Sequence, residues 1–265
     1  MNPQPGAGAA SFTALVLAGS RGPEDPIARH CGIQHKCLAP VRGAPMLARV
    51  LEALAASSSI GRIFVSLADP AILAGLTTPA RCSALVSGAT PSMSVLQALD
   101  EISDPLPLLI TTADHPLLSA AMVDGFCAEA RAKGGDLVAG LTDARVIRAA
   151  YPEARRTYLR FADAAYSGAN LFALLTLEGR RAVTFWRRVE QERKRPWRLV
   201  RAFGLGPLLA YLLGRLTLDD AMARASTVIG ARVAAARLPF AEAAIDVDKP
   251  ADLALVEAIL ARSGG

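Results

Sequence analysis

The sequence predicts an α/β fold of three layers, in which helices cover both faces of a mostly parallel central sheet. Short apolar segments alternate with amphipathic ones between Phe12 and Thr142. The apolar segments are hydrophobic at nearly every position, as strands buried on both faces are. Such strands, separated by helices, favour a parallel sheet that places its ligands at the carboxyl ends of the strands.

The first half of the chain contains the regular part of this alternation. Strands are expected at 12–18, 62–67, 82–87, 106–111 and 136–140, and helices at 45–56, 71–76, 92–102 and 119–133. The helix at 45–56 carries Leu47, Val50, Leu51 and Leu54 on one face. Ser92 is expected to cap the helix at 92–102, and Gly134 with Gly135 to end the helix at 119–133.

The alternation changes after Thr142. Strands outside the simple pattern are expected at 145–150, 157–161 and 170–175. The segment 177–216 is predicted to be helical and basic, with Pro196 in the first turn of a helix. Strands at 231–238 and 243–247 and a helix at 250–262 are expected to close the chain.

Composition limits the classes of protein to consider. The 265 residues are 52% apolar, yet no uncharged run is long enough to span a bilayer. The segment 7–19 lacks the basic start of a signal peptide and is interpreted as the first strand. The four cysteines show no framework spacing, which favours reduced thiols in a cytoplasmic protein. No nucleic-acid recognition module is recognisable.

A small-residue loop follows the first strand, in the sequence LVLAGSRG. Without bulky side chains the backbone N–H groups of such a loop can approach phosphate oxygens closely. Lys36 and Arg21 add positive charge, which a polyphosphate requires. The spacing matches neither the Walker pattern nor the Rossmann glycines. The loop therefore predicts a nucleotide-phosphate site, with a solvated surface lysine as the alternative for Lys36.

Acidic residues follow two later apolar segments. Asp114 comes directly after the strand at 106–111, where a hard cation such as Mg²⁺ is held by one or two carboxylates and the substrate's phosphates. Asp246 and Asp248 alternate on an expected strand, so they should face the same side. Asp248 is thus placed to complete a metal site with Asp114. Asp252 is interpreted as a carboxylate in the first turn of the final helix.

Together these motifs resemble the MobA-like nucleotidyltransferases, which share the glycosyltransferase-A-type fold and include molybdenum-cofactor guanylyltransferases. Sugar-phosphate cytidylyltransferases are related to them. The resemblance runs over most of residues 12–260. It rests on the segments LVLAGSRG, HKCLAPVRGAPML, SGATPSMSVLQAL, LLITTADHPLL and IDVDKPADL.

The resemblance implies roles for individual residues. The triphosphate would be held by the first loop and its lysine, at Leu17, Ala18, Gly19, Ser20, Arg21, Gly22 and Lys36. Mg²⁺ or Mn²⁺ would be held by Asp114 and Asp248, and the base would contact Gly88 and Ser94. Lys36, Asp114 and Arg21 would be the catalytic residues. The family usually ends the first loop in G-x-R-M, whereas Gly22 is followed here by Pro-Glu-Asp-Pro, so Arg21 or Arg29 would have to replace the usual arginine.

The implied reaction transfers a nucleotidyl group. An oxyanion of a phosphorylated or similar acceptor attacks the α-phosphorus of a nucleoside triphosphate (NTP), and pyrophosphate leaves. CTP is slightly favoured through Gly88 and Ser94, and GTP is the alternative. Other interpretations are guanylyl or cytidylyl transfer to a molybdenum cofactor, a glycosyltransferase of the same fold, and a non-catalytic nucleotide-binding module. A glycosyltransferase would normally need the D-x-D that Thr112-Ala113-Asp114 does not provide.

These assignments imply a domain organisation. Residues 1–10 would be a disordered tail, and 11–265 a single domain. Within it, 11–142 would bind the nucleotide and 143–240 the acceptor, with a helical insertion at 177–225, and 241–265 would form a closing strand and helix. Asn170 and Asp246 are the expected acceptor contacts.

The segment 180–201 is strongly basic and contains Trp186 and Trp197. This pattern suits an anionic membrane surface, an acidic or lipid-linked acceptor, or a solvated charged face. We therefore expect a cytoplasmic protein that can contact a membrane peripherally.

The sequence offers no convincing Ser/His or His/Asp pairing, and His30, Cys31, His35 and Cys37 fit no common zinc spacing.

Overall fold

The computed structural model describes residues 10–19, 22–192 and 203–263. Its centre is an eight-stranded sheet in the order β10-β7-β9-β6-β1-β4-β5, with β8 paired to β9. These strands are β1 (Phe12–Leu17), β4 (Ile60–Leu67), β5 (Cys82–Val86), β6 (Leu108–Thr112), β7 (Leu137–Asp143), β8 (Leu159–Arg160), β9 (Ala165–Leu174) and β10 (Val233–Leu238). Within this sheet β9 runs antiparallel to β6, β7 and β8, and the other pairs are parallel. The predicted mostly parallel sheet is confirmed.

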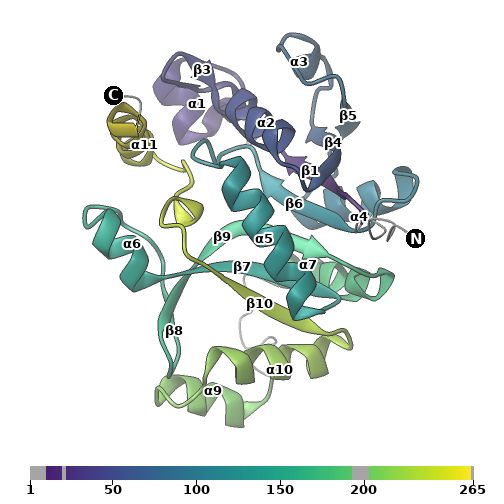
Figure 1. Cartoon of the computed structure of the whole chain (residues 1–265), viewed down its shortest axis with the longest axis vertical. Coiled ribbons are helices and arrows are strands. Elements are labelled where there is room, and N and C mark those ends of the chain that lie inside the picture. Colours follow the sequence, from purple (N-terminus) through teal and green to yellow (C-terminus); the bar gives the residue numbers. More distant parts are fainter. Residues whose placement is uncertain (1–9, 20–21, 193–202, 264–265) are drawn as a thin grey trace, which may run out of the picture.

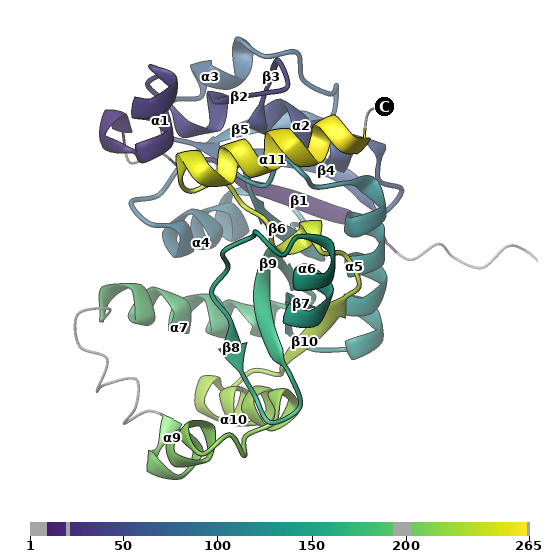
Figure 2. The ribbon, with the colours of Figure 1, turned by 90° about the vertical axis from the view of Figure 1, so that its left-hand side faces the viewer.

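Helices cover both faces of the sheet (Figures 1 and 2). On one face α2 (Met46–Ala56) and α5 (Ala120–Lys133) pack over Ala14 and Val16 of β1. On the other, α4 (Pro91–Glu101) and α7 (Arg180–Gln191) pack over Leu15. Neighbouring β1 side chains thus enter opposite cores, as the alternation of a strand requires. The three predicted layers are therefore present.

A third cluster of apolar side chains joins the end of the chain to the segment after β1. The final helix α11 (Pro250–Ser263) contributes Val256 and Ile259, and α1 (Pro26–Cys31) contributes Ile27. Val41 of the two-residue strand β2 (Pro40–Val41), which pairs with β3 (Ala44–Pro45), lies in the same cluster. This packing brings the closing segment beside the segment that follows β1.

Three expected strands or parts of strands are wrong. The segment 145–150 forms α6 (Ala144–Ala150), because the Asp143 carboxylate accepts from the backbone N–H of Arg145 at 2.7 Å and caps a helix there. The segment 157–161 is strand only at β8. The segment 243–247 is no strand: a 3-10 turn η4 (Glu242–Ala244) precedes an irregular stretch up to α11.

The helical part of the second half also differs from expectation. After the 3-10 turn η3 (Leu177–Gly179), α7 ends at Gln191, and a separate helix α9 (Leu205–Leu212) follows. Pro196 and Trp197 lie outside the described residues. Helix α10 (Leu218–Ile229) was not expected in full, although Thr217 caps its start and left-handed Gly230 ends it. Both are ordinary helix-boundary signals.

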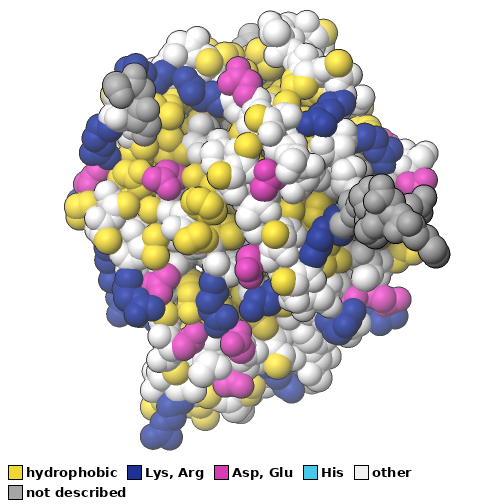
Figure 3. Space-filling view, in the orientation of Figure 1, with side chains coloured by type: hydrophobic (Ala, Val, Ile, Leu, Met, Phe, Trp, Pro, Cys, Tyr) yellow, Lys and Arg dark blue, Asp and Glu magenta, His cyan; other side chains and the backbone are white. Residues whose placement is uncertain are grey.

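Smaller differences concern helix ends and surface. Thr90, not Ser92, caps α4, because its hydroxyl accepts from the N–H of Met93 and Ser92 lies inside the first turn. The short helix expected at 71–76 is α3 (Ala71–Ala74). All four cysteines are free thiols. Among the described residues no helix is both long and apolar enough to cross a bilayer. On the face in Figure 3, the described basic and acidic side chains are interspersed.

Candidate active site

The candidate site lies at the carboxyl edge of the four strands β1, β4, β5 and β6. Leu17 at the end of β1 is in register with Thr112 of β6 and Ser66 of β4. Beyond the register, the N–H of Ala113 donates to the Leu17 carbonyl at 3.0 Å, and the N–H of Ala18 donates to the Ser66 carbonyl at 2.9 Å. The loops that follow β1 and β6 therefore leave the sheet side by side.

Lys36 joins the two predicted metal ligands. It begins the 3-10 turn η2 (Lys36–Leu38), and its Nζ donates to Asp114 Oδ2 at 2.6 Å and to Asp248 Oδ1 at 2.7 Å. The Lys36 side chain is only 13% exposed. Burial by itself would lower the pKa of Lys36, but the carboxylates of Asp114 and Asp248 outweigh it and raise the pKa. Two acidic groups that are 134 positions apart in the sequence thus meet at one cation.

Backbone contacts hold the closing segment in this position. The N–H of Val247 donates to the Asp114 carbonyl at 2.9 Å. Asp252, in the first turn of α11, accepts from the N–H groups of Asp248 and Lys249 at 3.1 and 3.0 Å. Its role is therefore wider than a helix-dipole contact, because it fixes the backbone that presents Asp248.

The expectation that Asp246 and Asp248 face the same side was based on strand alternation, and the missing strand removes that basis. Asp246 instead contacts Arg156 and Asn170: Asn170 Nδ2 donates to Asp246 Oδ2 at 2.9 Å. Asn170 has a φ of +49° inside β9, next to an irregularity in the β7–β9 register. A bulge of this kind redirects a side chain out of the regular alternation. The two expected acceptor residues therefore lie in contact with each other.

Arg156 is a residue that sequence reasoning missed. Its side chain is 8% exposed and lies between Asp246 and Asp252, with Nη2 donating to Asp252 Oδ1 at 2.8 Å. It thereby links the segment after α6 to both ends of the stretch that presents Asp248. An arginine in an irregular segment, directly after the exposed Arg155, gives no local sequence signal for such a position.

The first loop is described in part. Ala18 is buried, and a Cβ added to Gly19 would meet no atom within 4 Å. Ser20 and Arg21 lie outside the described residues. Gly22 has a φ of +73° and begins the short turn η1 (Gly22–Glu24). The unusual Pro-Glu-Asp-Pro that follows builds α1, because Asp25 accepts from the N–H of Ile27 at 2.9 Å. Arg29 of α1 is exposed and pairs with Glu24 at 3.6 Å.

The loop after β5 reaches the same edge of the sheet. Its Gly88 N–H donates to Ser94 Oγ at 3.0 Å, and Ser94 Oγ donates to the Thr90 carbonyl at 3.3 Å. A Cβ on Gly88 would lie 2.8 Å from Met93 Cβ, so a glycine is required there. The two residues expected to contact the base are therefore hydrogen-bonded to each other, and Ser94 holds the loop through its contacts with Gly88 and Thr90.

His115 has a structural position, and the described His, Cys, Asp and Glu side chains form no cluster that could hold a metal ion. His115 is buried, its Nε2 lies 3.2 Å from the Glu242 carbonyl, and burial lowers its pKa. No three His, Cys, Asp or Glu side chains among the described residues gather closely enough to hold a metal ion.

Comparison with known proteins identifies the family. The model of the MobA-like NTP transferase domain matches residues 14–193, a range that includes the first loop, Lys36, Gly88 and Asp114. The chain belongs to the MobA-like NTP transferase family. It is accordingly a nucleotidyltransferase. No match was found among the curated proteins.

Solved structures agree with membership in the MobA-like family. A structure described as a hypothetical transferase from Thermus thermophilus is 32% identical, with a TM-score of 0.77. The match covers 92% of this chain and 100% of the Thermus chain. A CMP:2-keto-3-deoxy-manno-octonic acid synthetase complexed with CTP is 14% identical, with a TM-score of 0.56 and 96% and 98% coverage. A 4-diphosphocytidyl-2C-methyl-D-erythritol synthase from Anaerococcus prevotii is 13% identical, with a TM-score of 0.54 and 95% and 97% coverage. The last two show a shared fold.

Proposed function

We propose that this nucleotidyltransferase transfers NMP from an NTP to a phosphorylated or similar oxyanion acceptor and releases pyrophosphate. One observation carries the proposal: Lys36 Nζ lies between Asp114 and Asp248, and the loop that carries Asp114 leaves the sheet beside the first loop. A cation clasped by two carboxylates at the carboxyl edge of a parallel sheet is suited to a polyphosphate with its divalent ion.

The residues present fit a divalent metal ion. Asp114 Oδ1 is buried and has no hydrogen-bond partner among the described residues, so one hard oxygen is available. Asp114 and Asp248 would hold Mg²⁺ or Mn²⁺ together with phosphate oxygens, and the family of NTP-using transferases is consistent with such an ion. When bound, such an ion would neutralise negative charge on the phosphates.

The protein's own groups would then align the reactants. The backbone of residues 18–22 approaches the triphosphate, and Leu17 ends the strand that supports this loop. The Lys36 ammonium would exchange its carboxylate partners for the phosphate oxygens, and Arg21 would be a second cation at the phosphates. An acceptor oxyanion is already nucleophilic, so alignment and charge neutralisation carry the catalysis and no strong general base is needed.

The base and acceptor sites are assigned to opposite sides of this centre. We assign the base to the loop at Gly88, with CTP slightly favoured over GTP, and Ser94 shapes that loop from within. We assign the acceptor to the side of Asn170 and Asp246. The Arg156 guanidinium neutralises Asp246, which allows an anionic acceptor to approach a carboxylate. Transfer to a molybdenum cofactor is the same chemistry on another acceptor.

The test is pyrophosphate release with each of the four NTPs against a panel of phosphorylated metabolites. Asp114→Ala and Asp248→Ala should each lose about a hundredfold or more in rate, the cost of removing charge stabilisation at a reacting phosphate. Glu129→Ala, at an exposed carboxylate on α5, is the matched control and should keep the wild-type rate. Full activity in Asp114→Ala, or no release with any NTP, would contradict the proposal.

A second proposal concerns a membrane or a lipid-linked acceptor. Exposed leucines on and after α9 support it: Leu209, Leu212 and Leu213 are 56%, 69% and 65% exposed. Trp186, in contrast, is half-buried, and its ring stacks on Phe172 of β9. Cosedimentation with anionic vesicles at low salt tests the proposal, with Leu209→Ser/Leu212→Ser expected to reduce binding. Wild-type protein that stays in the supernatant would end it.

A further inference from the structure

Helix α7 is the described part of the basic segment, and it lies along α4 in the opposite direction. At one end, Arg180 donates to both carboxylate oxygens of Asp100, in the last turn of α4, at 2.6 and 2.9 Å. At the other end, Glu190 contacts Ser92 in the first turn of α4. Because the first turn of α4 follows the loop at Gly88, Glu190 stands at the edge of the sheet that carries the candidate site.

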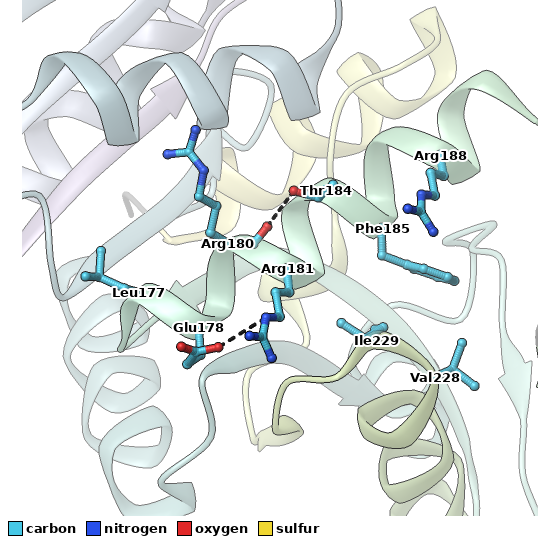
Figure 4. Close-up of a pocket in the computed structure, with 9 residues that line it drawn as sticks. All are labelled: Leu177, Glu178, Arg180, Arg181, Thr184, Phe185, Arg188, Val228 and Ile229. Atoms are coloured by element: carbon cyan, nitrogen blue, oxygen red, sulfur yellow. Dashed lines mark hydrogen bonds and ion pairs between the residues drawn. The ribbon is translucent and has the colours of Figure 1, made fainter.

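The beginning of α7 is also held from its other side. Figure 4 shows Arg181 and Arg188 on the side of α7 that faces Val228 and Ile229 of α10 across a cavity of about 390 Å³, whereas Arg180 points away from them. Arg181 is bonded within it to Glu178 at 3.2 Å and to the Gly230 carbonyl at 2.8 Å. Val183 is buried in the sheet-facing core. Helix α7 is therefore anchored before it reaches Ser92.

Glu190 begins a chain of hydrogen bonds that ends at the Gly88 loop. The ionised carboxylate can only accept, so the Ser92 hydroxyl donates to Glu190 Oε2. The Thr90 hydroxyl then donates to Ser92 Oγ at 3.0 Å and accepts from the Met93 N–H at 3.3 Å. Each hydroxyl thus has a single orientation, fixed by the carboxylate at the start.

The last links of this chain are in the loop itself. The Thr90 carbonyl accepts from the N–H of Ser94 at 3.0 Å and from its hydroxyl, and Ser94 Oγ accepts from the Gly88 N–H. Ser92 is fully buried, so water cannot replace Glu190 as its partner without a rearrangement. The carboxylate also lies at the positive end of α4.

We propose that Glu190 is a positioning residue, which holds the loop 88–94 in the shape that receives the base of the NTP. The inference rests on the proposed function for the location of the base. The basic segment thereby has a role within the enzyme, because α7 positions the Glu190 carboxylate at the loop 88–94.

The first arm of the test uses kinetics. Glu190→Ala should raise KM for the NTP about tenfold, the effect of losing a charge-assisted hydrogen bond, with kcat within about twofold. Glu190→Gln keeps an acceptor for the Ser92 hydroxyl and should restore most of the wild-type KM. In the double variant with Ser92→Ala, the two effects should be less than additive. Arg187→Ala, at an exposed position on the same helix, is the control.

The second arm needs no activity. Amide hydrogen exchange of the ligand-free protein should become about tenfold faster at residues 88–94 in Glu190→Ala and stay unchanged in Arg187→Ala. Faster exchange in Glu190→Ala, together with no NTP turnover even in the wild type, would refute the proposed function but support the role of Glu190 in holding the loop 88–94. Unchanged exchange, or a lower kcat with unchanged KM in an active enzyme, would overturn the role of Glu190.

Discussion

The backbone N–H of Val247 donates a 2.9 Å hydrogen bond to the carbonyl oxygen of Asp114. This bond joins the closing segment to the loop after β6, and the packing of α11 and the contacts of Arg156 and Asp252 hold it there as well. Together these contacts bring Asp248 within reach of Lys36, which Asp114 also contacts. The charge arrangement of the site therefore depends on contacts between segments far apart in the chain, one of which joins two backbones.

Replacing Lys36 should strengthen metal binding while abolishing transfer. Its ammonium group competes with any cation for Asp114 and Asp248, so Lys36→Met should bind Mn²⁺ about tenfold more tightly in the absence of nucleotide. Electron paramagnetic resonance of free Mn²⁺ measures this affinity directly. Lys36→Arg retains the competing charge and should stay near the wild-type affinity. Equal affinities in all three proteins would show that the ammonium does not occupy the cation position.

Substitutions of Gly19 and Gly88 should affect different properties: the first KM for the NTP, the second the free energy of unfolding. Gly19→Ala adds a methyl group that meets no atom, so the free energy of unfolding should change by less than about 0.5 kcal/mol. The methyl would obstruct a triphosphate at the loop, and KM for the NTP should rise about tenfold. Gly88→Ala instead forces Cβ to 2.8 Å from Met93 Cβ and should lower the free energy of unfolding by about 1–3 kcal/mol.

Urea denaturation and steady-state kinetics on both glycine variants make the comparison. A stable Gly19→Ala protein with wild-type KM would argue against phosphate binding at the first loop.

Loss of Arg156 should weaken both the fold and the site. Arg156→Met leaves Asp246 and Asp252 half-buried without their cation, which should cost about 3 kcal/mol of unfolding free energy. Because Asp252 holds the backbone of Asp248, Mn²⁺ affinity should fall as well. Arg155→Met, at the exposed neighbouring position, is the control for urea denaturation and metal titration. A destabilised Arg156→Met protein with unchanged Mn²⁺ affinity would separate the two effects and contradict the second.

Asp124 should contribute to stability in acid without affecting transfer. Partial burial would raise its pKa, but hydrogen bonds from Ser57, Ser58 and Ser59 outweigh this and lower it from 3.8 to about 2. The folded pKa lies below the unfolded one, so this stability is present above about pH 4 and is lost as pH falls through about 2. Solvent screening reduces it to about 1 kcal/mol at neutral pH.

The variant Asp124→Asn should therefore unfold more easily at pH 7 and approach the wild type near pH 2. Thermal unfolding followed across pH 2–7 measures the difference, with pyrophosphate release as the check on function. A constant difference at all pH values would assign the effect to packing and not to the charge.

Local sequence determined the strands of the first half of the chain, most of the helices and the residues of the candidate site at Lys36 and Asp114. Uninterrupted apolar runs mark the buried strands, and a small-residue loop after the first of them limits what can bind there. Helix boundaries were harder, because α6 depends on one capping bond from Asp143 and α10 on signals at Thr217 and Gly230.

Only the tertiary structure decided which acidic residues act together. The sequence of the closing segment contains Asp246, Asp248 and Asp252, and strand alternation would pair the first two. Backbone bonds to Asp114 and the buried Arg156 separate them instead: Asp248 turns to Lys36 and Asp246 to Asn170. Residue spacing governs neighbours on one element, whereas contacts between elements far apart in the chain are set by how the layers pack.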